Sequence, residues 1–475
     1  MTVDLGTPLV LEGTLFALAV IVLIVGLIRQ NDPEQYTGWL TFVGLIGVFA
    51  LSCSAHEGQS LFEGTFVQDS LALFAKRLFL LASAVSLLGS LTLRQPTFSR
   101  RAAEYYFALL VSLLGMLVLA SARELILLFV AFELMSIPLY VLTGFMKRDA
   151  VAPEAALKFF LVGTASSAVI AYGMSFVFGV TGTTALAAIP QALRDGHPLM
   201  LLGMGLLLAG LGFKIAAFPF HMWAPDTYEA ASTPFVAWLS VAPKAAGFVA
   251  LIRLYVEGVG PAALMWMPFI ATLAAMTVIT GNLMAIPQHN IKRMLAYSGI
   301  AHIGYMLIGL AAFSSAGIAT ILFYLVAYLF GNMGAFLVVE VVARSEQSNG
   351  IDAYRGLAQR SPLLALAMLV FLLSLGGIPF VAGFWAKLYI FVAAAERGLY
   401  GLVFVGAVLT VVALYYYLVV ARRMYIEAPE RPEPIPMPGL LGVAIAICAI
   451  GVVGVGVYPA PWVALAQRIA ATLFS

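Results

Sequence analysis

The sequence predicts an all-α polytopic membrane protein, and three observations lead to this fold class. Of the 475 residues, 62% are hydrophobic and 10% are charged, and the mean hydropathy is +1.01. A soluble domain is usually about half apolar and about a quarter charged. The apolar runs are long and continuous, as in membrane helices, whereas the strands of a membrane barrel alternate. The third observation is an internal repeat. Composition alone excludes a water-soluble enzyme, a secreted disulfide scaffold and a disordered chain.

About fourteen transmembrane helices are expected, because each crossing needs about 20 apolar residues. In chain order, they are expected at 8–28, 36–54, 70–93, 103–121, 124–146, 154–180, 198–229, 234–256, 262–284, 290–312, 315–344, 362–396, 399–421 and 437–458. The segments 198–229 and 362–396 are longer than one straight crossing requires. Both contain helix breakers, which are Pro219 in the first and the Gly-Gly-Ile-Pro sequence at 376–379 in the second.

The repeat relates these two broken segments. Ala131–Gly144 resembles Ala296–Gly309, 165 positions later, and the same offset places Gly212 on Gly377. Five spans starting near residue 103 therefore match five spans starting near residue 262. Because five is odd, the second copy should be inverted in the membrane, as in many secondary transporters.

We therefore expect two inverted five-helix repeats, each containing a broken helix. The expected division is 1–102 for the three N-terminal helices, 103–256 for the first repeat, 262–421 for the second repeat, and 437–475 for helix 14 and the tail.

The positive charges predict an orientation. The odd-numbered loops and the adjoining span ends carry fourteen Lys and Arg residues, against five on the even-numbered side and the C-terminal tail. Because loops rich in Lys and Arg stay in the cytoplasm, both termini are expected outside.

The sequence offers no sign of a cofactor site. Cys53 and Cys448 lie far apart, the five histidines lack metal-ligand spacing, and no nucleotide-binding motif is present. The net charge of +2 also argues against a nucleic-acid partner. We expect no cofactor or metal in this chain, and we expect the lipid bilayer as its main surroundings.

Four ionisable residues lie where charges are expensive, since one at the bilayer centre costs about 2.5–3.5 kcal/mol by insertion scales. Glu133 and Lys244 lie near the middle of the fifth and eighth expected spans. Lys214 precedes the Pro219 break, and Lys387 follows the second break. Because the apolar segment runs on beyond Lys214, we expect this lysine not to lie at a helix end.

Each of these residues also has a structural interpretation. Glu133 could simply pair with a neighbouring helix, and Lys214 and Lys387 could extend their ammonium groups to the membrane interface. Lys244 lies about 15 Å from either end of its span at about 1.5 Å per residue, which makes such extension difficult.

Three further residues are weaker candidates. Lys158 follows Glu154 by four residues, a spacing that is also typical of a surface ion pair. His302 could relay protons or could be a packed, hydrogen-bonded core histidine. His221, in the first broken segment, has the same two interpretations.

Together these groups could pass a proton. Burial disfavours a charged ammonium, and a nearby carboxylate favours it. At an effective dielectric constant of about 20, two unit charges about 4 Å apart interact with about 4 kcal/mol. Separating a Glu–Lys pair could therefore release the proton of the lysine.

Three stretches carry a family resemblance. They are FELMSIPLYVL at 132–142, GFKIAAFPFHMWAPDTYEAASTPFVAWLSVAPKAAGF at 212–248, and IPFVAGFWAKLYIF at 378–391. They closely resemble the antiporter-like membrane subunits of respiratory complex I, and the resemblance extends from the fourth to the thirteenth span. It implies fourteen helices with two inverted repeats, each with a broken helix. FVAGF at 380–384 departs from the more usual PxAGF of the family.

The resemblance also implies a proton-transfer role for each deep charge. Glu133 matches the glutamate of the family's fifth helix, and Lys214 matches the lysine of its broken seventh helix. Lys244 and Lys387 match the lysines of the eighth helix and the broken twelfth helix. Lysine at 387, where sister subunit M has glutamate, favours one branch of the family. The shorter chain argues against sister subunit L.

The resemblance implies a proton-translocating subunit of an enzyme complex, driven by quinone reduction elsewhere in that complex. NADH, FMN, iron–sulfur clusters and quinone are then expected in partner subunits. M-like and K-like neighbours are expected in a bacterial inner membrane. Two alternatives remain open, which are a subunit of a multisubunit cation/proton antiporter without redox partners and a structural membrane scaffold.

Overall fold

The computed structural model describes residues 8–29, 33–93, 96–146, 151–192, 198–260 and 263–474. Within these ranges, thirteen helices are long and apolar enough to cross a membrane. The other expected crossing, at 362–396, is a broken helix made of α17 (Pro362–Gly376) and α18 (Ala382–Glu396). The helical membrane fold is therefore confirmed. Four of the charges used to predict the orientation lie outside the described residues, which are Arg94, Lys147, Arg148 and Arg194.

The chain forms two compact units. The first contains the described residues up to Ile215 together with Ala242–Leu264, and the second contains Ala216–Val241 and the described residues from Met265 onward. These units do not coincide with the expected sequence repeats, because Ala216–Val241 was expected in the first repeat. In the second unit this segment forms α10 (Trp223–Ala230), which packs on α14 (Ile291–Ala311), and α11 (Thr233–Leu239), which packs on α15 (Ser315–Glu346).

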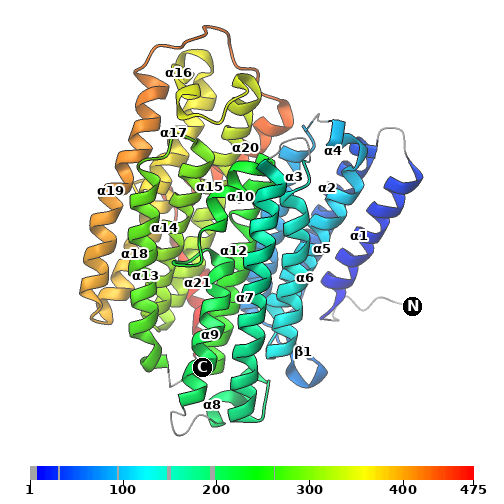
Figure 1. The fold of residues 1–475 in the computed structure, drawn as a ribbon, viewed down its shortest axis with the longest axis vertical. Coiled ribbons are helices and arrows are strands. Elements are labelled where there is room, and N and C mark those ends of the chain that lie inside the picture. The colour runs from blue at the N-terminus through cyan, green and yellow to red at the C-terminus, as the bar shows by residue number, and fades with distance from the viewer. Residues whose placement is uncertain are drawn as a thin grey trace. The chain divides into compact units, whose positions relative to one another are not determined.

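The first unit is a helical bundle in which α5, α6 and α7 lie side by side (Figure 1). Its helices are α1 (Val10–Ile28), α2 (Pro33–Ser54), α3 (Ser70–Ser90), α4 (Pro96–Arg100), α5 (Ala102–Ser121), α6 (Leu125–Thr143), α7 (Val151–Thr181), η2 (Leu186–Ala188), α8 (Ile189–Ala192), α9 (Pro198–Ile215), α12 (Ala242–Ile252) and the π-helix η3 (Arg253–Val259). Within the described ranges, the all-α expectation omitted one type of element. It is a short antiparallel hairpin of β1 (Gln59–Leu61) and β2 (Phe66–Gln68), joined by η1 (Phe62–Gly64).

The second unit is also helical. Besides the elements already given, it contains α13 (Ala263–Ala285) from Met265 onward, η5 (Ile351–Tyr354), α16 (Leu357–Arg360), α19 (Tyr400–Tyr425), α20 (Gly439–Val457) and α21 (Ala460–Ala471). The long α15 lies at its centre and packs against α14, α17, α18, α20 and α21. Its N-cap is Ser314, whose hydroxyl accepts a hydrogen bond from the Gly317 N–H at 3.0 Å.

Two pairs of contacts show that the sequence repeat is also a structural repeat. The Glu124 side chain caps α6 by accepting from the Leu127 N–H at 2.7 Å, and Asn290 caps α14 by accepting from the Lys292 N–H at 2.9 Å. These caps lie 166 positions apart in the printed sequence.

The capping residues also hold loops together. In the first unit Glu124 forms a β-bridge with Ala185, and in the second unit Asn290 forms one with Gly350. Each bridge therefore joins the loop before the second helix of a repeat to the loop after its third helix. Phe66 also bridges to Ala122, so three even-numbered loops meet at one end of the first unit.

The two repeats share a close helix crossing as well. A Cβ atom added to Gly115 on α5 would lie 2.3 Å from the Met135 backbone nitrogen on α6. A Cβ atom added to Gly281 on α13 would lie 2.3 Å from the Ala301 backbone nitrogen on α14. Only glycine allows the helices to approach so closely, because the obstacle is rigid backbone.

We expect Gly115→Val and Gly281→Val each to destabilise the protein by at least about 1–3 kcal/mol, the usual cost of overpacking. The measurement is the thermal unfolding temperature in detergent together with the amount of folded protein in the membrane. Gly47→Val is the matched control, because a Cβ atom there meets nothing within 4 Å. Wild-type stability of both crossing variants would contradict the close approach.

Candidate functional site

The first polar cluster lies between α6, α7 and α9 in the first unit. The Ser167 hydroxyl on α7 donates to the Glu133 carboxylate on α6. One turn along α6, the Ser136 hydroxyl accepts a hydrogen bond from Lys214 Nζ at 2.9 Å. Ser136 therefore holds the Lys214 ammonium one helical turn from Glu133.

Lys214 lies at a helix end, so the expectation that it would not was wrong. Helix α9 ends at Ile215, and the following Ala216 has a φ of 60°. A non-glycine residue in this region costs about 1–3 kcal/mol and stops the helix before Pro219 is reached. Extension to the membrane interface is nevertheless excluded, because Lys214 is only 1% exposed.

Lys244 lies one helical turn before Gly247, a residue of α12 that adjoins Lys214. The eighth expected span is interrupted at 240–241, so that Lys244 lies in the first turn of α12 and not in a continuous helix. Helix α12 packs against α3, α5 and α9, and Lys244 is 1% exposed. A Cβ atom on Gly247, one turn later, would lie 3.8 Å from Lys214 Cγ. The first unit thus brings Glu133, Lys214 and Lys244 together.

Lys387 forms a second cluster within the second unit. Its Nζ donates to the carbonyls of Leu375 at 2.9 Å and of Gly376 at 3.2 Å, the last carbonyls of α17. Helix α17 ends because Gly377 has a φ of 83°, a conformation that glycine adopts readily. Lys387 therefore points back to the helix break and is 4% exposed, which excludes extension to the interface.

Aromatic hydroxyls and His302 extend this second cluster. Lys387 Nζ lies 4.8 Å from the centre of the Tyr305 ring. His302, one turn from Tyr305 on α14, has its Nδ1 2.6 Å from the Tyr324 hydroxyl and its Nε2 3.3 Å from the Tyr417 hydroxyl. His302 is therefore a buried, hydrogen-bonded histidine, as both of its interpretations require.

The remaining candidates lie elsewhere. Lys158 is half-exposed on α7 and forms an ion pair with Glu154 at 2.8 Å, as the surface-pair interpretation predicts. His221 lies in the break between α9 and α10 and stacks on Phe218, with ring centres 5.9 Å apart. Its Nδ1 has no hydrogen-bond partner among the residues that the structure describes.

Sequence reasoning missed several members of these clusters. Ser136, Ser167 and Tyr417 are common residue types in membrane helices, so they carry no distinctive sequence signal. Lys292 was counted only as a topological charge, but its Nζ donates to the carbonyls of Glu229 at 2.9 Å and Ala231 at 2.7 Å. It therefore caps α10, much as Lys387 caps α17.

Both clusters have the chemistry of proton transfer. Each contains a buried ammonium beside hydroxyl or carbonyl oxygens, and each adjoins a helix break where backbone groups are free to accept hydrogen bonds. In the described part of the chain, no three His, Cys, Asp or Glu side chains gather in a way that could hold a metal ion.

A protein-family model described as "NADH:quinone oxidoreductase/Mrp antiporter, TM" matches residues 122–413. The chain belongs to this family. It is 40% identical over 461 residues to NADH-quinone oxidoreductase subunit N of Moorella thermoacetica, a match that covers 96% of this chain and 97% of the relative. It is 41% identical over 452 residues to subunit N 1 of Thermodesulfovibrio yellowstonii, covering 95% and 96% of the two chains. The family branch that the sequence favoured is therefore confirmed as that of subunit N.

Two solved structures have a similar fold. A chain of respiratory complex I from Thermus thermophilus with bound aureothin is 34% identical, with a TM-score of 0.83, covering 96% of this chain and 99% of that chain. A chain of the Mrp complex from a Dietzia species has a TM-score of 0.85 but only 20% identity, covering 98% of each chain. This second likeness concerns the fold alone.

We expect Ser136→Ala to destabilise the protein by about 1–3 kcal/mol, because it leaves the buried Lys214 ammonium without its acceptor. The loss should largely disappear in a Lys214→Met background, which a double-mutant cycle of thermal unfolding would measure. Ser175→Ala is the control, since that exposed hydroxyl donates only to the Tyr172 carbonyl within its own helix. Equal losses in both backgrounds would show that the pair is not coupled.

Proposed function

We propose that this chain carries protons across the membrane as a membrane-arm subunit of a proton-translocating NADH:quinone oxidoreductase. One observation carries the proposal, which is that Lys214, Lys244 and Lys387 are each 4% exposed or less at or beside interruptions of membrane helices. Burying three ammonium groups is expensive, and a structural scaffold has no need of them. The full-length likeness to subunit N relatives supports the same function.

Glu133, Lys214 and Lys244 form the first part of the path. Glu133 lies on α6, and Ser136 on the same helix holds the Lys214 ammonium one turn away, so a proton has a short distance to travel between the two groups. Lys214 then adjoins α12, where Lys244 receives the proton. Loss of the charge interaction with Glu133 favours the neutral form of Lys214, and restoring it favours the charged form.

Lys387 forms the second part of the path. The carbonyls of Leu375 and Gly376 hold its ammonium, and the Tyr305 ring lies beside it. His302 can accept and donate protons, and its two tyrosine partners fix the direction of its ring. The exposed Lys158 lies outside this path, whereas His221 lines the first break and can take part.

The redox reaction takes place outside this chain in our proposal. NADH, FMN, iron–sulfur clusters and quinone belong to partner subunits, and M-like and K-like membrane subunits are the neighbours. The chain lies in a bacterial inner membrane. Its odd-numbered loops face the cytoplasm and both termini lie outside, because the charge asymmetry favours this orientation.

We expect Lys244→Met to abolish most proton pumping while leaving the complex assembled, because methionine keeps the apolar stem and removes the titrating group. The measurement is the number of protons moved per NADH oxidised in membrane vesicles, at equal amounts of assembled complex. Lys158→Met is the matched control and should pump normally, since that ammonium is exposed. Normal pumping by an assembled Lys244→Met complex would refute the path.

The orientation has a separate test. A reporter enzyme that is active only outside the cytoplasm should be active when fused after Gly182, which follows α7, and inactive after Gly350, which follows α15. The reverse activities would overturn the proposed orientation without affecting the proton path.

A further inference from the structure

The Lys387 ammonium has uncharged partners in the second unit. Its Nζ donates to the carbonyls of Leu375 at 2.9 Å and Gly376 at 3.2 Å, and it lies 4.8 Å from the centre of the Tyr305 ring. Gly377 leaves room for this arrangement, since a Cβ atom there would lie 2.9 Å from Lys387 Cδ. An ammonium has three hydrogens to donate, and two of them have carbonyl acceptors. The Tyr305 ring is therefore its third partner.

The first repeat has a carboxylate at a position where the second repeat has none. Glu133 lies on α6, and the matching position 165 residues later is Ser298, which pairs with the Tyr417 hydroxyl. A buried ammonium must be compensated for the water that it loses, and a carboxylate is the usual partner. For Lys387 the compensation comes from two carbonyls and a ring.

An aromatic ring beside a buried lysine occurs in both repeats. Lys214 Nζ lies 5.4 Å from the centre of the Phe132 ring on α6. Tyr305 lies on α14, the corresponding helix of the second repeat. Both distances fall within about 6 Å, the range of cation–π attraction. The two rings do not occupy matching sequence positions, so the contact was acquired separately in each repeat.

Four neighbours fix the orientation of the Tyr305 ring. Its hydroxyl lies 3.1 Å from Thr410 Oγ1 and 3.5 Å from Asn282 Nδ2. The ring packs edge-to-face against Phe391 and His302, with ring centres 6.2 Å apart in each pair. Tyr305 is also 1% exposed. Because both the hydroxyl and the ring edges are held, the ring keeps its face toward the ammonium.

Resting on the proposed function, we propose that Tyr305 is a positioning residue for proton transfer and that its ring serves as an uncharged counter-ion for Lys387. The face of an aromatic ring carries partial negative charge and attracts an ammonium, whereas it attracts a neutral amine far less. A carboxylate could take the proton of the lysine, but a ring face cannot. Tyr305 therefore holds the protonated lysine at the helix break without competing for its proton.

The Tyr305 hydroxyl anchors the ring and takes no part in the transfer. Its removal leaves its two neighbours with other partners, because Thr410 Oγ1 also donates to the Gly406 carbonyl at 2.9 Å. Asn282 Nδ2 likewise donates to the Val278 carbonyl at 2.9 Å. Tyr305→Phe thus keeps the ring and its edge contacts and removes the hydroxyl alone, which makes it an informative variant.

The test is the number of protons moved per NADH oxidised in membrane vesicles, at equal amounts of assembled complex. We expect Tyr305→Phe to pump like the wild type. Tyr305→Leu, which removes the ring, should show most of the loss that Lys387→Met shows. Tyr354→Leu is the matched control, since it removes an equally buried tyrosine from η5, in the loop between α15 and α17. Once assembled, this control should pump normally.

Fluorinated phenylalanines at position 305 separate the charge of the ring face from packing. Each fluorine draws electron density away from the face and weakens its attraction for an ammonium, while the size of the ring changes little. We expect pumping to fall progressively from phenylalanine through difluorophenylalanine to trifluorophenylalanine. The same series at position 354 is the control and should show no trend.

Three outcomes would overturn the proposal. Loss of pumping in Tyr305→Phe would show that the hydroxyl is a relay group. Wild-type pumping by Tyr305→Leu would show that the ring is unnecessary, and equal pumping across the fluorinated series would assign the ring to packing only. If Tyr305→Leu does not assemble, Tyr305→Met replaces it with the same expectation, because methionine is unbranched and fills irregular gaps. The fluorinated series decides the matter even if neither variant assembles.

Lys387→Met separates this proposal from the proposed function. If Lys387 has no place in the proton path, an assembled Lys387→Met complex pumps normally. If only the role of the ring is wrong, Lys387→Met loses pumping as expected, whereas Tyr305→Leu and the fluorinated variants pump like the wild type.

Discussion

A lysine ammonium inside a membrane must be held by oxygen atoms that the protein supplies, because the hydrocarbon offers none. A regular helix has no spare carbonyls except at its ends. Interruptions of the membrane helices meet this demand, since Lys387 binds the last carbonyls of α17 and Lys292 binds those of α10. Lys214 uses the Ser136 hydroxyl instead. The coincidence of deep lysines and broken helices follows from this one requirement.

The two copies of the repeat share backbone features but differ in their polar side chains. Both copies have a glycine at a close helix crossing and a capped helix start, so their backbones share these two features. The charges differ, because Lys214 precedes its break and Lys387 follows the other. Where the first copy places Glu133, the matching position of the second copy is Ser298, beside Tyr417 and His302. The carboxylate of the first copy and the histidine–tyrosine network of the second copy suit successive steps of one proton transfer.

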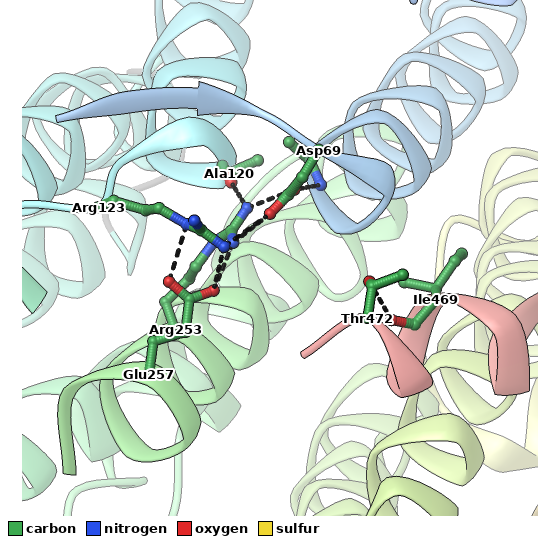
Figure 2. A network of polar contacts seen from close by, with 8 residues as sticks. Asp69, Ala120, Arg123, Arg253, Glu257, Ile469 and Thr472 are labelled. Atoms are coloured by element: carbon green, nitrogen blue, oxygen red, sulfur yellow. Dashed lines mark hydrogen bonds and ion pairs between the residues drawn. The ribbon is translucent and has the colours of Figure 1, made fainter. Parts of the chain in front are cut away.

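Much of this was predictable from the sequence. The spans follow from continuous hydropathy, and both broken helices follow from their Pro and Gly residues. The end of α9 was not predictable, because Ala216 adopts a positive φ that no sequence rule assigns to alanine. The ion pairs of Arg253 with Asp69 and Glu257 (Figure 2) were also missed, since Asp69 and Arg253 lie 184 positions apart and only folding shows that they pair. Long-range polar pairing leaves no periodic signal in one sequence.

The central claim is that these lysines titrate and do not merely cap helix ends, and Lys387→Arg tests it most directly. Arginine keeps the positive charge and the donors for the carbonyls of Leu375 and Gly376, but it does not release a proton. The measurement is the number of protons moved per NADH oxidised, normalised to assembled complex. Our account predicts that the assembled variant oxidises NADH with most of its pumping lost. Wild-type pumping by Lys387→Arg would contradict it, because a residue that cannot titrate would then be sufficient.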